Sequence, residues 1–282
     1  MTGSAAALVD VWRDRRVRFT LTGIAIAYLV LRWFLLLTSD DPLLAADAYT
    51  YWSAPYDNPY RGPQLGLPGA YLYPPPFIQA LAPLRLLPWE VFHAAWAALG
   101  FGALVFLVGP IGGALAVTIL PFVFRDLLVG NIHLMLGAVI VIGFRYPAIW
   151  AFPLLTKLTP GVGLLWFAGR REWRKFGIGV AVTAAIAVVS FALAPNLWLE
   201  WVDRLRGDTG RAGDLYVTLI GVRLALAAAI VLYAGWRGRA WLVPIAIVLA
   251  LPILWPDSLA ILLACLPLAR MRRPGRQNER SR

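Results

Sequence analysis

The sequence predicts an all-α polytopic membrane protein, folded as a bundle of about 8–10 membrane segments. Hydrophobic residues make up 60% of the 282 residues, and the mean hydropathy is +0.69. Charged residues make up only 15%, whereas soluble domains contain about 25%. Apolar runs recur along the whole chain, and many approach the roughly 20 residues that a helix needs to cross a bilayer.

This composition excludes a soluble enzyme, a secreted disulfide module and a disordered chain. The net charge is +11, but the basic residues lie mainly in short segments between apolar runs, which is typical of membrane topology. We therefore expect no nucleic-acid partner. The single cysteine, Cys265, lies in an apolar run, and only two histidines are present, His93 and His133. We expect no disulfide framework, no metal site and no cofactor.

The apolar runs define the elements in order. Residues 1–18 form a basic N-terminus, and residues 19–269 form the membrane domain. Its first span, 19–38, is expected to stay uncleaved because it is long and no small-residue cleavage site follows. A long first extracytoplasmic loop, 39–88, contains an expected interfacial helix at 77–87. The further apolar segments are 89–108, 111–124, 127–143, 147–156, 160–168, 176–195, 215–235, 240–255 and 257–269.

Charge distribution predicts the orientation. With the N-terminus in the cytoplasm and 147–168 folded as a re-entrant hairpin, 17 of the 26 Lys and Arg residues lie inside, as the positive-inside trend requires. If 147–168 crosses once instead, the basic group at 170–175 falls outside. We expect a multi-pass protein of the cell membrane with a cytoplasmic N-terminus and a basic cytoplasmic tail, 270–282. Residues 200–214 are expected to form a solvated, mixed-charge outside loop.

Three basic residues lie at membrane depth: Arg32, Lys157 and Arg223. Ionisable groups at this depth are costly and usually functional. Pro153 and Pro160 bracket Lys157, which favours a helix break there. An ammonium at the tip of such a break can hold a phosphate, although an interfacial lysine that snorkels is the alternative. Each arginine either pairs with a loop carboxylate or helps to bind an anionic headgroup.

The first loop combines acidic and aromatic residues, notably Asp47, Tyr51, Trp52 and Tyr73. Carboxylates accept hydrogen bonds from sugar hydroxyls and rings stack on sugars, so the loop suits carbohydrate; an aromatic interface belt is the alternative. Further polar residues are expected on the same outer face and could serve the site. For two of them a structural role is the alternative: His133 would pack between helices, and Asp257 would cap a helix. The further polar residues are Arg125, Asp126, Asn131, His133, Asp257 and Ser258.

The order of short motifs resembles glycosyltransferase family 87 over roughly residues 20–270. The first loop contains Asp47-Ala-Tyr-Thr-Tyr-Trp52 and then Tyr71-Leu-Tyr-Pro-Pro-Pro-Phe77. Gly130-Asn131 stands where the family typically has Gly-Gln, and it is followed by Lys157-Leu-Thr-Pro160. A basic stretch with a tryptophan, Arg170-Arg-Glu-Trp-Arg174, and a late Pro252-Ile-Leu-Trp255 complete the pattern.

This resemblance implies a GT-C-like enzyme of the membrane that transfers a sugar, with mannose expected, from a polyprenyl-phosphate donor. The acceptor would be a lipid or glycan on the extracytoplasmic side, and the anomeric carbon would invert. Asp47 matches the catalytic base, and Lys157 would contact the donor phosphate with Arg32 or Arg223. The residues expected around the sugar and acceptor are Tyr51, Trp52, Tyr73, Asn131, His133 and Asp257.

Two other functions use the same residues. A membrane transporter or lipid-binding protein would hold the lipid without chemistry, although the chain lacks the matching helix breaks in two halves that many transporters show. A catalytically degenerate scaffold subunit of the same family would bind the donor without releasing polyprenyl phosphate. The sequence has no glycine-rich phosphate loop and no Asp-x-Asp pair, which fits a lipid-linked rather than a nucleotide-linked donor.

Overall fold

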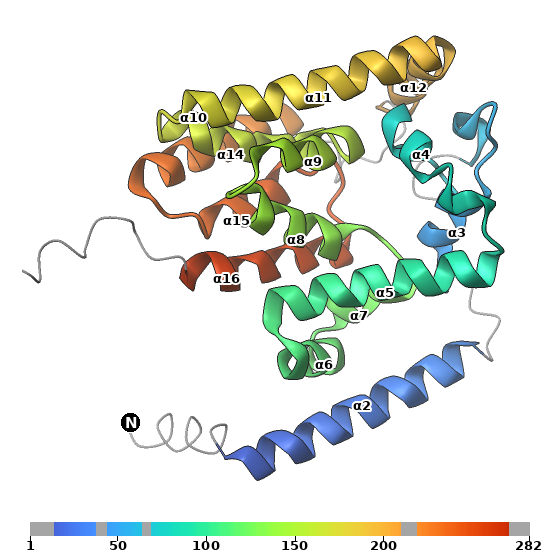
Figure 1. The fold of residues 1–282 in the computed structure, drawn as a ribbon, viewed down its shortest axis with the longest axis vertical. Helices are drawn as coiled ribbons and strands as arrows, with labels where there is room; N and C mark the ends of the chain where they lie inside the picture. The colour runs from blue at the N-terminus through green and yellow to red at the C-terminus, as the bar shows by residue number, and fades with distance from the viewer. Residues whose placement is uncertain (1–13, 38–43, 64–68, 210–218, 271–282) are drawn as a thin grey trace, which may run out of the picture.

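The computed structural model describes residues 14–37, 44–63, 69–209 and 219–270, and every regular element in these ranges is a helix. The long helices are α2 (Arg15–Leu37), α5 (Trp89–Val108), α11 (Trp173–Leu193) and α14 (Ile220–Arg237). Figure 1 shows α5 and α11 on opposite sides of a core of shorter helices, with α2 alongside α6.

The all-α membrane class is confirmed. By length and composition α5, α11 and α14 suffice to cross a membrane, and the bent pair α6–α7 is a fourth candidate. Shorter apolar helices occur at 19–28, 133–143 and 147–156. Several of the expected membrane segments are therefore short helices among the described residues.

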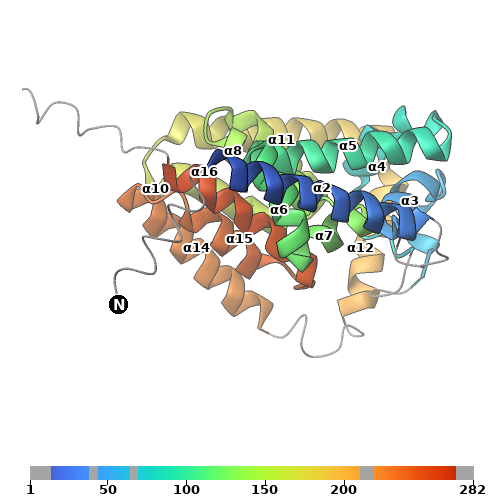
Figure 2. The same ribbon diagram turned by 90° about the horizontal axis from the view of Figure 1, so that it is seen from below.

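The first loop forms helices at one end of the bundle, next to α12 (Figures 1 and 2). The interfacial helix expected at 77–87 corresponds to α4 (Pro75–Leu81) and the 3-10 turn η2 (Leu84–Leu86). Upstream lie α3 (Ala46–Ser53) and the 3-10 turn η1 (Pro59–Arg61). Proline begins both α4 and η1, where its missing N–H costs nothing.

The loop expected at 200–214 is wrong over residues 200–209, because α12 (Pro195–Thr209) is a helix. Its apolar side chains recur at helical spacing, so one face packs against the rest of the protein, and Arg204 on this helix donates to the carbonyls of Tyr60 and Gly62 in the first loop. Trp201 Nε1 donates to the carbonyl of Leu72 at 3.1 Å, and Trp198 Nε1 donates to Ser190 Oγ at 3.0 Å. The helix therefore connects the end of α11 to the first loop. Residues 210–214 lie outside the described residues.

The segments expected at 111–124 and 127–143 divide differently. The chain forms α6 (Pro110–Ile119), α7 (Pro121–Val129) and α8 (His133–Gly143), and α6 and α7 meet at 96°. Pro121 explains the bend, because a proline cannot continue the hydrogen bonding of α6 and suits the first turn of a new helix. The break places the end of α7 and the start of α8 beside α3.

The chain reverses direction at Lys157. The 3-10 turn η3 (Pro147–Trp150) and α9 (Ala151–Thr156) lead to it, and η4 (Thr159–Leu164) and α10 (Leu165–Gly169) lead away. The start of the first arm and the end of η4 lie beside the same part of α11: a Cβ added at Gly179 would lie 3.2 Å from the Pro147 carbonyl and 2.6 Å from Leu164. The chain therefore folds back on itself as a hairpin with Lys157 at its tip, and its re-entrant position in the membrane stays a prediction.

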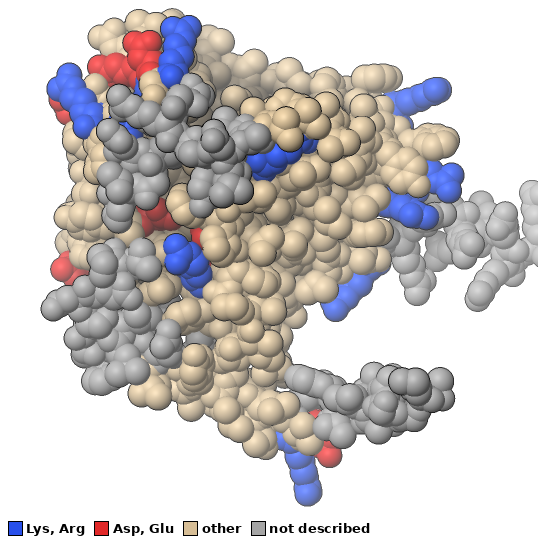
Figure 3. All heavy atoms as spheres, turned by 180° about the vertical axis from the view of Figure 1, so that it is seen from behind, with Lys and Arg blue, Asp and Glu red and all other residues tan. Residues whose placement is uncertain are grey.

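After α14 the chain forms α15 (Leu242–Ala250), the 3-10 helix η5 (Pro256–Ala264) and α16 (Cys265–Arg270). η5 packs against α7 and α8, which brings its first turn to the site. Figure 3 shows acidic and basic side chains together near the end that carries α3 and α12, whereas the side chains that project from the opposite edge are Lys and Arg. The orientation in the membrane stays a prediction.

Candidate active site

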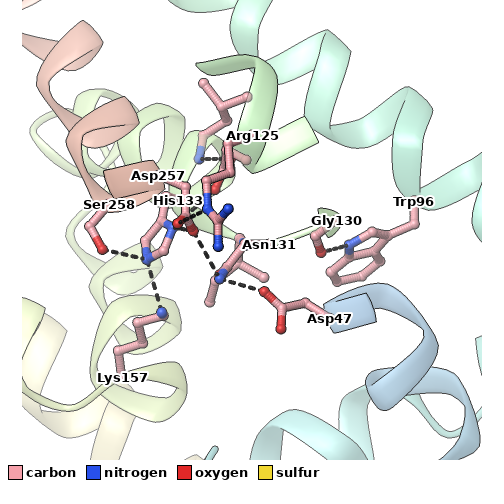
Figure 4. Close-up of polar contacts among 12 residues, drawn as sticks. Asp47, Trp96, Arg125, Gly130, Asn131, His133, Lys157, Asp257 and Ser258 are labelled. Atoms are coloured by element: carbon pink, nitrogen blue, oxygen red, sulfur yellow. Dashed lines mark hydrogen bonds and ion pairs between the residues drawn. The ribbon is translucent and has the colours of Figure 1, made fainter. Parts of the chain in front are cut away.

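A cluster of polar side chains lies where α3, the α7–α8 turn, the hairpin tip and η5 meet (Figure 4). Its members come from four separate parts of the chain, so only the fold assembles it. We call it the polar cluster, and its residues are Asp47, Arg125, Asp126, Asn131, His133, Lys157, Asp257 and Ser258.

Close backbone packing places α3 against the α7–α8 turn. The Ala45 amide donates to the Leu128 carbonyl at 2.8 Å, and Trp96 Nε1 donates to the Gly130 carbonyl at 2.8 Å. Gly130 ends α7 with φ of 70°, and a Cβ there would lie 2.6 Å from the Ala48 Cβ. Glycine is needed on both counts, since it allows positive φ and this approach.

Asn131 connects two carboxylates. Its Oδ1 accepts a hydrogen bond from the Ile132 amide at 2.8 Å, which fixes the orientation of the side-chain amide. Its Nδ2 therefore faces Asp47 Oδ2 at 2.7 Å and Asp257 Oδ2 at 3.3 Å. Arg125 Nε lies 3.3 Å from Asp257 Oδ1. The amide thus holds the Asp47 carboxylate through one of its two oxygens.

Burial raises the pKa of the Asp47 carboxyl from 3.8 to about 6, against the opposing positive charge of Lys157. The neighbouring Asp257 and Asp126 carboxylates raise this pKa further. A carboxylate with a pKa just below neutral is ionised at pH 7 and is a stronger base than an exposed one, which is how enzymes tune general bases. The site therefore prepares Asp47 to accept a proton.

His133 lies at the centre of the cluster and is fully buried. Its Nδ1 lies 2.9 Å from Asp126 Oδ1 and 3.2 Å from Asp257 Oδ2. Its Nε2 lies 2.9 Å from Lys157 Nζ and 3.3 Å from Ser258 Oγ. The ring therefore links two carboxylates on one side to the hairpin tip on the other.

An aromatic wall borders the cluster near Lys157. Lys157 Nζ lies 5.6 Å from the Tyr73 ring centroid, within the range of a cation–π interaction. The Tyr73 and Tyr51 hydroxyls share a hydrogen bond of 2.7 Å, and Tyr51 also packs edge-on against Phe77 and Trp96. Burial raises the pKa of both tyrosines well above 10. Both phenols therefore stay neutral and act as hydrogen-bonding groups.

The structure brings together most of the residues that the sequence selected. Asp47, Asn131, His133, Lys157 and Asp257 all lie in the polar cluster. Tyr73 borders it, whereas Tyr51 is 1% exposed and supports Tyr73 from behind. Their roles remain predictions.

Two other selected residues lie elsewhere. Trp52 belongs to an aromatic group with Tyr49 and Trp89, and its Nε1 donates to the Leu87 carbonyl. Arg223 lies in the first turn of α14 and donates to the carbonyls of Leu249 and Leu251 at the end of α15. The side chain of Arg32 lies outside the described residues.

Sequence reasoning placed Arg125, Asp126 and Ser258 on the right face but gave them no role. The spacing of Asp126 and His133 could have indicated that they meet. They lie on either side of Gly130, where α7 ends and the chain turns into α8, and this turn brings the two side chains together. Asp126, His133 and Asp257 also offer one ligand-type atom each within 4.8 Å of one another. This buried trio is of the type that binds a metal ion. No sequence motif reveals it, because Asp257 is far from Asp126 and His133 along the chain.

A family model described as glycosyltransferase family 87 matches residues 71–280. The match includes every member of the polar cluster except Asp47, which precedes it. No curated protein and no solved structure matches the chain. The match covers well over half of the chain, and it begins in the first loop and ends in the basic tail.

Proposed function

The chain belongs to glycosyltransferase family 87 and is a membrane glycosyltransferase, and on that premise we propose that its donor is polyprenyl-phosphate mannose. It transfers the mannose, with inversion, to a lipid or glycan acceptor on the extracytoplasmic side of the cell membrane. Its partners are therefore the lipid-linked sugar, the acceptor and the surrounding lipids. The donor is a substrate, and the proposal requires no cofactor.

One observation carries this proposal: the polar cluster contains both a carboxylate that can act as a base, Asp47, and a cation held in place, Lys157. Asp47 is half-buried with a pKa of about 6, and Lys157 stands at the tip of the hairpin, half-buried beside Tyr73. Glycosyl transfer from a phosphate needs both groups, because a proton must leave the acceptor while negative charge develops on the departing phosphate.

The proposed step is a single displacement. Asp47 accepts the proton of an acceptor hydroxyl, and the oxygen attacks the anomeric carbon of the bound sugar. The bond between that carbon and the phosphate oxygen breaks, and its electron pair leaves with the polyprenyl phosphate. Lys157 stabilises the added charge on the phosphate, as preorganised donors do at a developing anion. Tyr73, with Tyr51 behind it, offers an aromatic surface for the sugar.

The donor class is tested with the purified protein in nanodiscs. Short-chain polyprenyl-phosphate mannose and a nucleoside-diphosphate mannose are offered separately, each with the same panel of glycolipid acceptors. We expect glycosylated product and polyprenyl phosphate only from the lipid-linked donor. The anomeric configuration of the product, read by NMR, should be opposite to that of the donor.

Other results would contradict the proposal. Turnover of the nucleotide sugar would show that the donor class is wrong. Retention of configuration would contradict the single displacement. Binding of the lipid donor without release of polyprenyl phosphate, across the acceptor panel, would favour a scaffold subunit, and movement of the intact lipid across the membrane would favour a transporter.

A further inference from the structure

Asp126, His133 and Lys157 form a continuous chain of contacts. Asp126 Oδ1 lies 2.9 Å from His133 Nδ1. His133 Nε2 lies 2.9 Å from Lys157 Nζ, and Figure 4 shows this second contact. Asp126 and His133 are 1% and 0% exposed, whereas Lys157 is half-buried. The chain therefore runs from the buried interior to the group that faces the site.

The protonation of this chain follows from what each atom can donate. The Asp126 carboxylate faces two nitrogen atoms, His133 Nδ1 at 2.9 Å and the Leu134 amide at 3.0 Å. The amide always donates, and a carboxylate can accept from both. Nδ1 also faces Asp257 Oδ2 at 3.2 Å. A bare Nδ1 lone pair between two carboxylates would be repelled, so this nitrogen carries the proton.

The other ring nitrogen is then fixed as an acceptor. In a neutral imidazole only one nitrogen is protonated, so Nε2 presents its lone pair to Lys157 Nζ. An ammonium has three donors and no acceptor, and one of them is used at Nε2. This leaves the Lys157 charge in place and its remaining donors for a ligand at the hairpin tip.

We propose that Asp126 and His133 are positioning residues that orient the Lys157 ammonium toward the donor phosphate. The identity of the ligand, a donor phosphate, rests on the proposed function. The protonation pattern of His133 does not depend on that function. It also changes the role expected of His133. A side chain with no exposed surface does not line the acceptor pocket; it acts through Lys157.

A metal ion is the competing occupant of the Asp126, His133 and Asp257 trio. A metal on Nδ1 would move the ring proton to Nε2. Nε2 would then be a donor facing the Lys157 ammonium at 2.9 Å, which places two donors against each other. The contact between His133 and Lys157 therefore favours a proton at Nδ1, and the two occupants predict opposite tautomers.

The tautomer is measurable without any substrate. The chain contains only two histidines, so protein labelled with ¹⁵N in the imidazole rings and held in detergent micelles gives two ring spin systems. His93→Gln assigns the remaining one to His133. We expect a protonated Nδ1 and an unprotonated Nε2 at pH 7.5. A protonated Nε2, alone or with Nδ1 also protonated, would overturn the proposal.

The spectrum of Asp126→Asn tests the role of Asp126. Asp126 faces His133 Nδ1 with one oxygen and the Leu134 amide with the other, and an asparagine keeps an oxygen at only one of these two positions, so it loses one of the two hydrogen bonds. We expect the Nε2-protonated tautomer to appear in this variant. If the His133 spectrum stays unchanged, Asp126 does not fix the tautomer. Adding Zn²⁺ to the wild type separates the metal alternative: a shift of the ring proton to Nε2 at low micromolar metal would contradict the proposal.

Kinetics with the lipid-linked donor complete the test. Glutamine at position 133 retains an acceptor for Lys157, whereas methionine of similar size does not. We expect His133→Met to lower kcat by about tenfold or more, since misplacing a charged group by about 1 Å has effects of this size. We expect His133→Gln to recover most of kcat, with the thermal midpoints of the two variants within a few degrees.

Equal kcat in His133→Gln and His133→Met, at equal thermal stability, would overturn the positioning role. The two failures remain distinguishable. If the wild type releases no polyprenyl phosphate but shows the expected tautomer, the proposed function fails and the arrangement of Lys157 stands. If the wild type turns over and the tautomer is reversed, the function stands and this inference fails.

Discussion

At the residue scale, Asp47 combines three properties that a catalytic base needs. Asn131 holds one of its oxygens at 2.7 Å, burial raises the pKa of its carboxyl to about 6, and Lys157 keeps that pKa from rising further. The residue lies in the first turn of α3 and outside the family match. Its assignment therefore depends on the geometry of the cluster.

The raised pKa of Asp47 predicts the acid limb of the pH profile. The base must be ionised to accept a proton, so kcat/KM should fall as the pH drops through about 6, by roughly tenfold per pH unit below it. Replacing Lys157 with methionine removes the charge that lowers this pKa. We therefore expect the midpoint of the residual activity in Lys157→Met to move to higher pH.

The control is Lys175→Met, which removes a half-exposed lysine paired with Glu172 at 2.8 Å. The pH midpoint of kcat/KM in Lys175→Met should match that of the wild type. A flat profile between pH 5 and pH 7 in the wild type would contradict the role of Asp47, as would a downward shift of the midpoint in Lys157→Met.

Gly130 gives a stability prediction at the same scale. Alanine at this position meets positive φ and the Ala48 Cβ at 2.6 Å. We expect Gly130→Ala to lower the free energy of unfolding by about 2 kcal/mol or more. The control is Gly177→Ala in α11, where no atom lies within 4 Å of the added Cβ, and it should be neutral or stabilising by about 0.5–1 kcal/mol.

Thermal unfolding in detergent measures both glycine variants. We expect the thermal midpoint of Gly130→Ala to lie clearly below that of Gly177→Ala. If the two midpoints coincide, the close approach of α3 to the α7–α8 turn is not a feature of the folded protein.

At the element scale, the hairpin tip stores backbone strain beside Lys157. Leu158 has φ of 55° and ψ of −62°, and the Thr159 amide donates to the Lys157 carbonyl at 2.6 Å. This is a γ-turn with positive φ, which is rare and strained for a residue with a Cβ. The side chain of Leu158 is 54% exposed, so little packing compensates for the strain.

We therefore expect Leu158→Gly to raise the free energy of unfolding by about 1 kcal/mol. The matched control is Leu199→Gly in α12, an exposed leucine in a helix, which should lower it by about 1 kcal/mol. The difference between the two thermal midpoints is the measurement. A lower midpoint in Leu158→Gly would show that the tip does not adopt this turn.

Sequence patterns predicted the elements whose signal is local. The 89–108 span matches α5, and the prolines around Lys157 marked the reversal of the hairpin. The helix α12 was missed because its charges suggest a solvated loop, while its apolar face is evident only against the first loop. The bend at Pro121 was missed because the hydropathy of 111–124 is continuous across it.

The candidate site shows the same division. Lys157 was selected because a basic residue in apolar surroundings is conspicuous in a sequence, and Asp47 because it matches the first-loop motif of the family that the sequence resembles. Asp126 and Ser258 became visible only when the fold brought α7 and η5 together around His133. No spacing rule joins residues that are 125 positions apart, so tertiary contacts were required.

At the scale of the whole molecule, the distribution of basic side chains predicts how the protein sits in the membrane. The polar cluster belongs to the end formed by α3, α4 and α12, whereas basic side chains project from the opposite edge (Figures 1 and 3). The positive-inside trend then places the basic edge in the cytoplasm and the cluster on the extracytoplasmic side.

Cysteine labelling in intact cells checks this orientation. In a Cys265→Ala background, we expect a membrane-impermeant maleimide to label Asp57→Cys, whose parent side chain is 77% exposed in the first loop. Lys175→Cys, at the start of α11, should be labelled only after permeabilisation. The reverse pattern would place the polar cluster on the cytoplasmic side and contradict the proposed topology.

The central claim is that Asp47 is the base of a lipid-donor glycosyltransferase. Release of polyprenyl phosphate from polyprenyl-phosphate mannose, with an acceptor that the wild type glycosylates, tests it most directly. We expect Asp47→Asn to lower turnover by about 10²-fold or more. The control Asp57→Asn removes an exposed loop carboxylate paired with Arg61 and should retain wild-type turnover. Normal turnover by Asp47→Asn would contradict the account.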